Sequence, residues 1–215
     1  MNYFSSPWTV DLPIGVDLER LGELLSTKPV RFLVGAERAE FHLHKGLVAS
    51  LSAPLDALVN RGAANMQDTS VAVFALFTQF VYSGHYNPGE SAGKYCREGN
   101  GHIQTKSNLL LQHAQLWDFA QTYQVEPLQH VVQMQLMNQL TLCRVSPVTF
   151  LAEFGELVRY VYGVSLSLDL RQIVGKFAAT VTADLCHLEG WRKLLSGCPG
   201  FSWDVLNAAL QLEGW

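Results

Sequence analysis

Hydrophobic and polar positions alternate one by one around Phe41 and Leu43, which is the period of a half-buried β-strand. A run at 30–34 that is apolar except for Arg31 precedes this segment, and the intervening residues, which begin with Gly35, form a turn signal. The pattern therefore predicts that 30–34 and 39–43 pair as a β-hairpin.

From Leu47 onward the apolar residues change to helical spacing. Ser52 and Pro54 interrupt this spacing, because proline is tolerated in the first turn of a helix and not in its interior. Serine is also a favoured N-cap residue. We expect one short helix that ends near Leu51 and a second that begins after Ser52 and ends at 60–62.

Apolar residues at helical spacing predict further helices along the rest of the chain. Two such stripes are Leu128, Val132, Leu136 and Leu140, and then Phe150, Phe154, Leu157, Val158 and Val161. We expect a short helix capped by Asp17, helices over 71–82 and 109–123, helices opened by Pro127, Pro147 and Leu170, and short helices around Trp191 and Trp203. The stretch 66–70 is expected to be a connector, and the glycine-rich polar stretch 87–107 a mobile insertion. The fold class that follows is α+β and predominantly helical, with a small sheet.

Several motifs occur in a fixed order along these elements. His44-Lys45 closes the second strand, Ser52 opens a helix, and further matches lie in 74–86, 113–128, 156–162 and Leu170-Arg171. In these positions the chain resembles a BTB/POZ domain protein of the fungal type. The resemblance implies the BTB/POZ fold, a small sheet flanked by helices, followed by a C-terminal helical extension. It divides the chain into a leader with a short helix (1–27), the BTB/POZ domain with the insertion 87–107 (28–145), and the helical extension (146–215).

The resemblance also implies a function. BTB/POZ domains self-associate and recruit partner proteins, and some act as adaptors in ubiquitin ligases or transcription complexes. A cullin-binding role is often linked to an apolar-x-Glu segment after the second helix. Here that region is shortened to 61–68, and 66–68 reads Met-Gln-Asp, so the sequence does not support a cullin partner.

A short leucine stripe marks the candidate interaction surface. Leu18, Leu21, Leu24 and Leu25 share one face of the first predicted helix. A helix of about two turns is marginal alone and needs a surface to pack on. It can fold back on its own domain or lie across a second copy of the chain, and the resemblance favours a homodimer.

Composition limits the remaining functional classes. Hydrophobic residues make up 48% of the 215 residues and charged residues 16%, which is enough for a substantial core. The formal net charge of −4 argues against a general attraction to nucleic acid or to an anionic membrane surface. No secretory signal, glycosylation acceptor or membrane-length apolar run is visible. We therefore expect an intracellular protein, cytoplasmic or nuclear, whose four cysteines are reduced.

Residues that bear metal or catalytic chemistry are few and widely spaced. His42 and His44 lie two apart on a strand and could share a metal, while Cys186, His187 and Cys198 lie near the C-terminus. The close cysteine pairs of structural zinc sites do not occur, nor do a nucleophile elbow, a Walker loop or a dinucleotide fingerprint. We expect no catalytic residues, no bound metal and no cofactor. A small metal-binding protein or enzyme built on these residues is the alternative.

Overall fold

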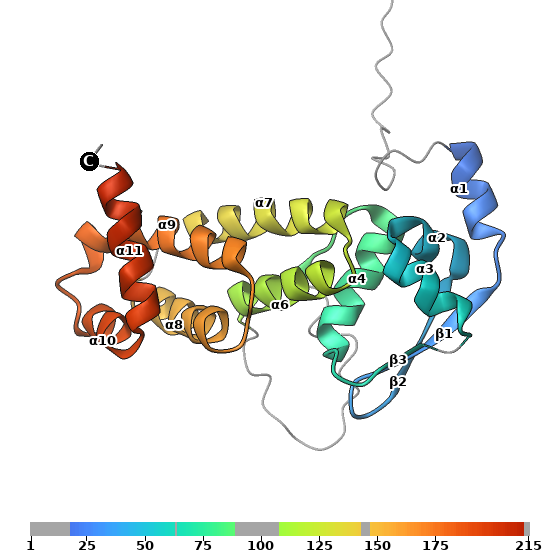
Figure 1. Cartoon of the computed structure of the whole chain (residues 1–215), viewed down its shortest axis with the longest axis horizontal. Helices are drawn as coiled ribbons and strands as arrows, with labels where there is room; N and C mark the ends of the chain where they lie inside the picture. Colours follow the sequence, from blue (N-terminus) through green and yellow to red (C-terminus); the bar gives the residue numbers. More distant parts are fainter. Residues whose placement is uncertain (1–17, 63, 89–107, 143–146, 213–215) are drawn as a thin grey trace, which may run out of the picture. The chain divides into compact units, whose positions relative to one another are not determined.

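A computed structural model describes residues 18–62, 64–88, 108–142 and 147–212 (Figure 1). The predicted cap at Asp17 and nearly all of the predicted insertion 87–107 lie outside these residues. Contacts divide the chain into two compact units, Met1–Arg97 with Tyr123–Pro127 and Glu98–Thr122 with Leu128–Trp215. The division into 1–27, 28–145 and 146–215 follows family resemblance and not packing, and it stays a prediction.

The first unit contains a three-stranded sheet with the order β2-β1-β3, where β1 is Pro29–Val34, β2 is Ala39–His44 and β3 is Ala64–Met66. Strands β1 and β2 are antiparallel, with Pro29 opposite His44 and Val34 opposite Ala39, so the predicted hairpin is confirmed. Gly35 has φ +71°, a conformation that glycine adopts without steric cost at this tight turn.

Strand β3 was not expected from the sequence, which predicted a connector from residue 66. It runs parallel to β1, with Phe32 opposite Ala64 and Val34 opposite Met66. The Gly35 N–H also donates a 3.0 Å hydrogen bond to the Met66 carbonyl. Three residues carry too short a pattern to reveal a strand, and here the pairing partner, some thirty residues away, decides the conformation.

The helices of the first unit are α1 (Leu18–Leu25), α2 (Lys45–Leu51), α3 (Ala53–Asn60) and α4 (Val71–Ser83). Ser52 lies between α2 and α3, and its Oγ accepts a 3.3 Å hydrogen bond from the Leu55 N–H, which confirms the predicted cap. Helix α4 ends at Gly84, whose φ of +73° allows its N–H to bond the Phe80 carbonyl.

Helix α4 supplies much of the core of the first unit. Phe74 and Phe77 are fully buried, and the Phe74 ring lies 5.2 Å from the ring of Phe32 on β1 and 5.5 Å from that of Phe77. Tilted ring pairs at this distance are favourable beyond the area that they bury. The helix is buried on more than one side, as its nearly continuous apolar sequence predicts.

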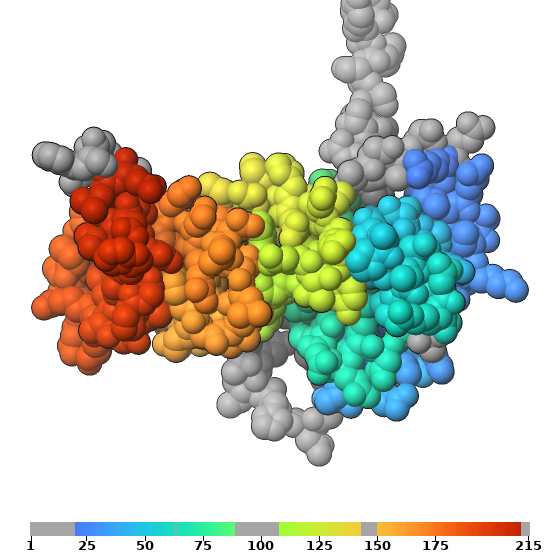
Figure 2. Space-filling model, viewed as in Figure 1, coloured from blue at the N-terminus to red at the C-terminus, as the bar shows by residue number. Residues whose placement is uncertain are grey.

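In its described residues the second unit contains helices and their connections and no strand, and α7 begins two residues before its second segment, Leu128–Trp215. Its helices are α6 (Leu109–Thr122), α7 (Glu126–Leu142), α8 (Pro147–Gly163), α9 (Leu168–Leu185), α10 (Glu189–Gly197) and α11 (Pro199–Leu212). Helix α6 packs on α8, and α9 packs on both α8 and α11. The orange α9 and the red α11 adjoin in the space-filling view (Figure 2).

Close packing in this unit follows the predicted apolar stripes. On α7 the buried residues are Leu128, Val132, Leu136 and Leu140, and on α8 they include Phe150, Phe154, Leu157, Val158 and Val161. Both stripes agree with the sequence analysis. Helices α9 and α11 approach closely at Gly175, where a Cβ atom would stand 3.1 Å from the Cβ of Asp204.

Candidate functional site

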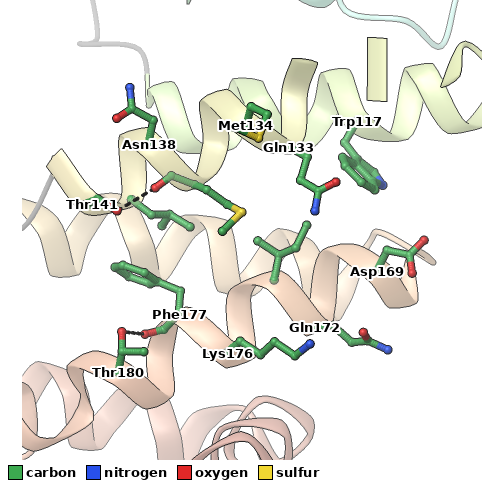
Figure 3. Close-up of a pocket in the computed structure, with 13 residues that line it drawn as sticks. Trp117, Gln133, Met134, Asn138, Thr141, Asp169, Gln172, Lys176, Phe177 and Thr180 are labelled. Atoms are coloured by element: carbon green, nitrogen blue, oxygen red, sulfur yellow. Dashed lines mark hydrogen bonds between the residues drawn. The ribbon is translucent and has the colours of Figure 1, made fainter. Parts of the chain in front are cut away.

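An open groove of about 860 Å³ separates α7 from α9 in the second unit. Figure 3 shows the α7 residues above and the α9 residues below this space, with Trp117 and Asp169 toward one end and Thr141 and Thr180 toward the other. The Phe177 ring points into the space from α9, and the Gln133 amide points into it from α7. A cavity of this volume is within the range of protein ligand sites.

The α7 wall of the groove carries no charge and combines Met134, Met137 and Leu140 with the uncharged polar residues Gln133, Asn138 and Thr141. Because the buried stripe of α7 faces the core, Met134 and Met137 are left 59% and 51% exposed. The sequence has no Asp, Glu, Lys or Arg from Pro127 to Leu142. Protein–protein interfaces are depleted of charge at their centre and enriched in methionine, whereas an ordinary helix surface is charged.

The α9 wall combines apolar residues with two charges. Ile173 and Phe177 are half-buried, and the Phe177 ring lies 5.8 Å from that of Phe154 in the core. Asp169 and Lys176 line the same wall and are exposed. The groove therefore has an apolar floor and a rim on which one anion and one cation stand.

A hydrogen-bonded network fixes the connection that leads into α9. Asp118 on α6 accepts a 2.8 Å hydrogen bond from Ser165 Oγ at Oδ1 and a 2.7 Å bond from Tyr160 OH at Oδ2. Burial raises the pKa of Tyr160 well above its ordinary value. The hydrogen bond to Asp118 and the negative charge of Asp118 raise this pKa further, in that order of size. The phenol is therefore a permanent donor near neutral pH, and the network holds the start of α9 in place.

Two further apolar surfaces of this unit are exposed. From Val164 to Leu168, at the connection of α8 to α9, the buried Ser165 and Ser167 alternate with exposed Val164, Leu166 and Leu168, and Leu166 is 92% exposed. Helix α11 exposes Trp203, Leu206 and Leu210 on one face. We place the candidate site in the groove, because it is lined from two helices and can contact an apolar side chain from both.

The predicted leucine stripe is partly covered within the first unit. Helix α1 packs on α2. A Cβ atom on Gly46 would stand 3.0 Å from the Leu24 carbonyl oxygen, which shows how close the two helices are. Leu21 and Leu24 are half-buried, Leu25 is 39% exposed, and the side chain of Leu18 is outside the described set. The homodimer through this helix remains a prediction.

The family-motif residues lie at joints of the first unit. The His44 Nδ1 atom lies 3.0 Å from the Tyr82 hydroxyl oxygen, and the backbone N–H of His44 donates a 3.3 Å hydrogen bond to the same oxygen. Lys45 begins α2, with its N–H bonded to the Lys28 carbonyl, and Ser52 caps α3. Each of these contacts stabilises the junction between two elements.

The residues of the metal-binding alternative are not gathered by the described part of the structure. His42 is exposed on β2, and His187 is exposed after α9. Cys186 and Cys198 are free thiols, the first exposed and the second half-buried. Within residues 18–62, 64–88, 108–142 and 147–212, no group of three or more His, Cys, Asp or Glu side chains lies close enough to hold a metal ion.

The groove was not predicted from the sequence. The stripe of Leu128, Val132, Leu136 and Leu140 is buried as predicted, whereas Met134 and Met137, which had no predicted role, are exposed on the same helix. One signal was available, because the charge-free stretch from Pro127 to Leu142 is unusual for a helix with an exposed face. That Ile173 and Phe177 lie across from it could not be read from the sequence.

Comparisons with known proteins add no relative. A scan against models of known protein families finds no match, and neither does a search of curated proteins. Among the described helices, none has the length and apolar character required to cross a membrane.

Proposed function

We propose that this chain is a protein-interaction module of the BTB/POZ type that binds a helical segment of a partner protein in the groove between α7 and α9. Its role is that of an adaptor, acting through binding and not through catalysis. The observation that carries the proposal is the charge-free α7 wall, on which Met134 and Met137 are more than half exposed. Ile173 and Phe177 line the same groove from α9.

The energetics favour a protein partner for such a surface. Burying a methionine or isoleucine side chain fully is worth about 1.5–3 kcal/mol, so the exposed parts of these side chains are a source of binding energy. Methionine is also flexible and polarizable, so it fits partner surfaces of different shape. A groove between two helices is a typical receptor for the apolar face of a third helix.

The BTB/POZ assignment draws its support from the sequence motifs and their order. The hairpin, the helix pair divided by Ser52, the helix that ends at Gly84 and the helices that follow occur in the expected sequence order. The motif residues His44 and Lys45 lie at the joint between β2 and α2. A cullin partner is not part of the proposal, since Met66 is buried in β3 and does not offer the apolar contact expected of that segment.

The test is a selection of helical peptides on the full chain. A display library with fixed leucines at i, i+4, i+7 and i+11 and random residues elsewhere presents the apolar face that such a groove accepts. Selected peptides are then measured by fluorescence anisotropy against wild type, Met137→Glu and Leu206→Glu. Met137→Glu places a charge in the groove, whereas Leu206→Glu places one on the exposed face of α11.

We expect saturable binding to the wild type, a loss of at least tenfold in affinity for Met137→Glu, and a change of less than twofold for Leu206→Glu. A library that yields no saturable binder contradicts the proposed function. Equal weakening by both variants, with the circular dichroism spectrum unchanged, would place the binding surface elsewhere.

A further inference from the structure

The groove carries one anion and one cation, and both stand on the same wall. Asp169 and Lys176 are the charged residues among those that line it, and Figure 3 shows both on α9, with Asp169 toward the Trp117 end. Neither forms an ion pair with another residue in the described ranges. The opposite wall on α7 offers no charge to either.

The spacing of the two charges matches the repeat of an α-helix. Asp169 and Lys176 are seven residues apart, which is about two turns and about 10.5 Å along the axis. A helix laid along α9 presents its own side chains at the same interval. Because the α7 residues that line the groove are uncharged, Asp169 and Lys176 are the only formal charges that the described lining residues offer to an occupant.

We infer that the partner helix carries an acidic residue opposite Lys176 and a basic residue opposite Asp169, seven residues apart on one edge of its apolar face. This inference rests on the proposed function and specifies the partner that the groove selects. Charge pairs at the rim of an interface contribute to register and partner choice more than to affinity, and like charges in these places oppose binding.

A second copy of the chain is the competing occupant. Trp203, Leu206 and Leu210 give α11 an exposed i, i+3, i+7 stripe of the kind that docks in grooves. The acidic residue of α11 in its described part is Asp204, which is half-buried and accepts a 2.8 Å hydrogen bond from the Tyr162 hydroxyl. The exposed stripe itself is uncharged, so α11 would leave both Asp169 and Lys176 unpaired. Charge complementarity therefore favours a separate partner with both signs of charge.

The experiment uses the library described above and reads the charges of the selected peptides. We expect enrichment of an acidic and a basic residue seven positions apart, and their order reports the direction in which the helix lies. Exchanging either residue for neutral glutamine should weaken binding by up to about fivefold, because an exposed pair contributes up to about 1 kcal/mol and that energy is a factor of about five. The effect should shrink at high salt.

The pairing is assigned with charge-reversed protein. Lys176→Glu should weaken the binding of the selected peptide. Binding to this variant should be restored by a peptide whose acidic residue is replaced by lysine. Lys193→Glu is the matched control, because it makes the same change in net charge on α10, outside the groove. Asp169→Lys provides the reciprocal test with a peptide whose basic residue is replaced by glutamate.

The outcomes separate the inference from the proposed function. The inference is overturned, and the proposed function stands, if peptides bind in the groove without a charge preference. The same holds if Lys176→Glu and Lys193→Glu weaken the binding of the selected peptides equally. A wild-type chain that self-associates in sedimentation equilibrium, with the association abolished by Leu206→Glu and competed by the selected peptides, assigns the groove to a second copy and also overturns it. The absence of any groove binder overturns both.

Discussion

The indole Nε1 of Trp117 donates a 3.0 Å hydrogen bond to the Oγ of Ser167, and both residues are buried. Ser167 is the N-cap of α9, and the same Oγ accepts a 3.3 Å hydrogen bond from the Leu170 N–H. Trp117 also lines one end of the groove. One hydroxyl therefore connects the end of the groove to the start of its α9 wall.

Ser167→Ala should lower the free energy of unfolding by about 2–4 kcal/mol, since it removes an N-cap and leaves the buried Trp117 N–H without its acceptor. Chemical denaturation followed by tryptophan fluorescence measures the loss. Ser52→Ala is the control, because Ser52 caps α3 through one half-buried hydrogen bond, and it should cost about 1 kcal/mol. Equal losses for the two variants would show that the Trp117 contact contributes little.

Gly46→Ala should destabilise the contact between α1 and α2. The added Cβ would stand 2.9 Å from the Thr27 Cγ2 and 3.0 Å from the Leu24 carbonyl oxygen, and relief requires α1 to move. We expect a loss of about 1–3 kcal/mol in thermal or chemical unfolding. Gly22→Ala is the matched control, since a Cβ atom at that position meets nothing within 4 Å.

Gly22→Ala should be neutral or stabilise the chain by up to about 1 kcal/mol, because alanine restricts the unfolded chain and favours the helix. If Gly46→Ala also proves neutral, α1 is not held against α2 in solution. In that case α1 would be free to pack on another surface.

Lowering the pH should destabilise the protein through His113. Burial lowers the pKa of His113 to about 4 from the ordinary 6.5, so the folded imidazole stays neutral when the unfolded one takes a proton. The contribution of neutral His113 to the free energy of unfolding is therefore fully present above pH 6.5. It falls as the pH drops from 6.5 toward 4. At about 1.4 kcal/mol per pH unit, the loss reaches about 3 kcal/mol.

Denaturant unfolding at pH 7 and at pH 5 measures this dependence. His113→Gln should flatten the slope between these values, whereas His130→Gln, an exposed position on α7, should leave it as in the wild type. A slope that survives His113→Gln would assign the pH dependence to another group.

Self-association through α1 gives a prediction of its own. The leucine stripe and the family resemblance favour a dimer, and Leu25 remains 39% exposed after α1 packs on α2. We expect sedimentation equilibrium to show a wild-type dimer at high micromolar concentration, and Leu21→Glu with Leu25→Glu to shift it to monomer. A closed two-fold contact needs roughly 1,000 Å² of buried surface to persist.

A wild-type chain that is monomeric at this concentration rules the dimer out. A dimer that survives the double substitution would require another surface, and Leu206→Glu then tests α11. The two results separate the N-terminal helix from the C-terminal one as the cause of association.

The sequence by itself determined the local elements of this protein. The alternation around Phe41, the serine and proline that divide α2 from α3, and the apolar stripe of α7 each act within a few residues, so the pattern predicts them directly. These signals established the mostly helical α+β class and the principal buried faces.

Tertiary structure decided the features that join distant segments. Strand β3 exists because Met66 and Val34 pair across some thirty residues, and the packing of α1 on α2 depends on the absence of a side chain at Gly46. The groove likewise requires Met137 and Phe177 to line one space from two helices that are separate in the sequence. A sequence pattern states which side of a helix is apolar but not what lies opposite, because that is set by long-range contacts.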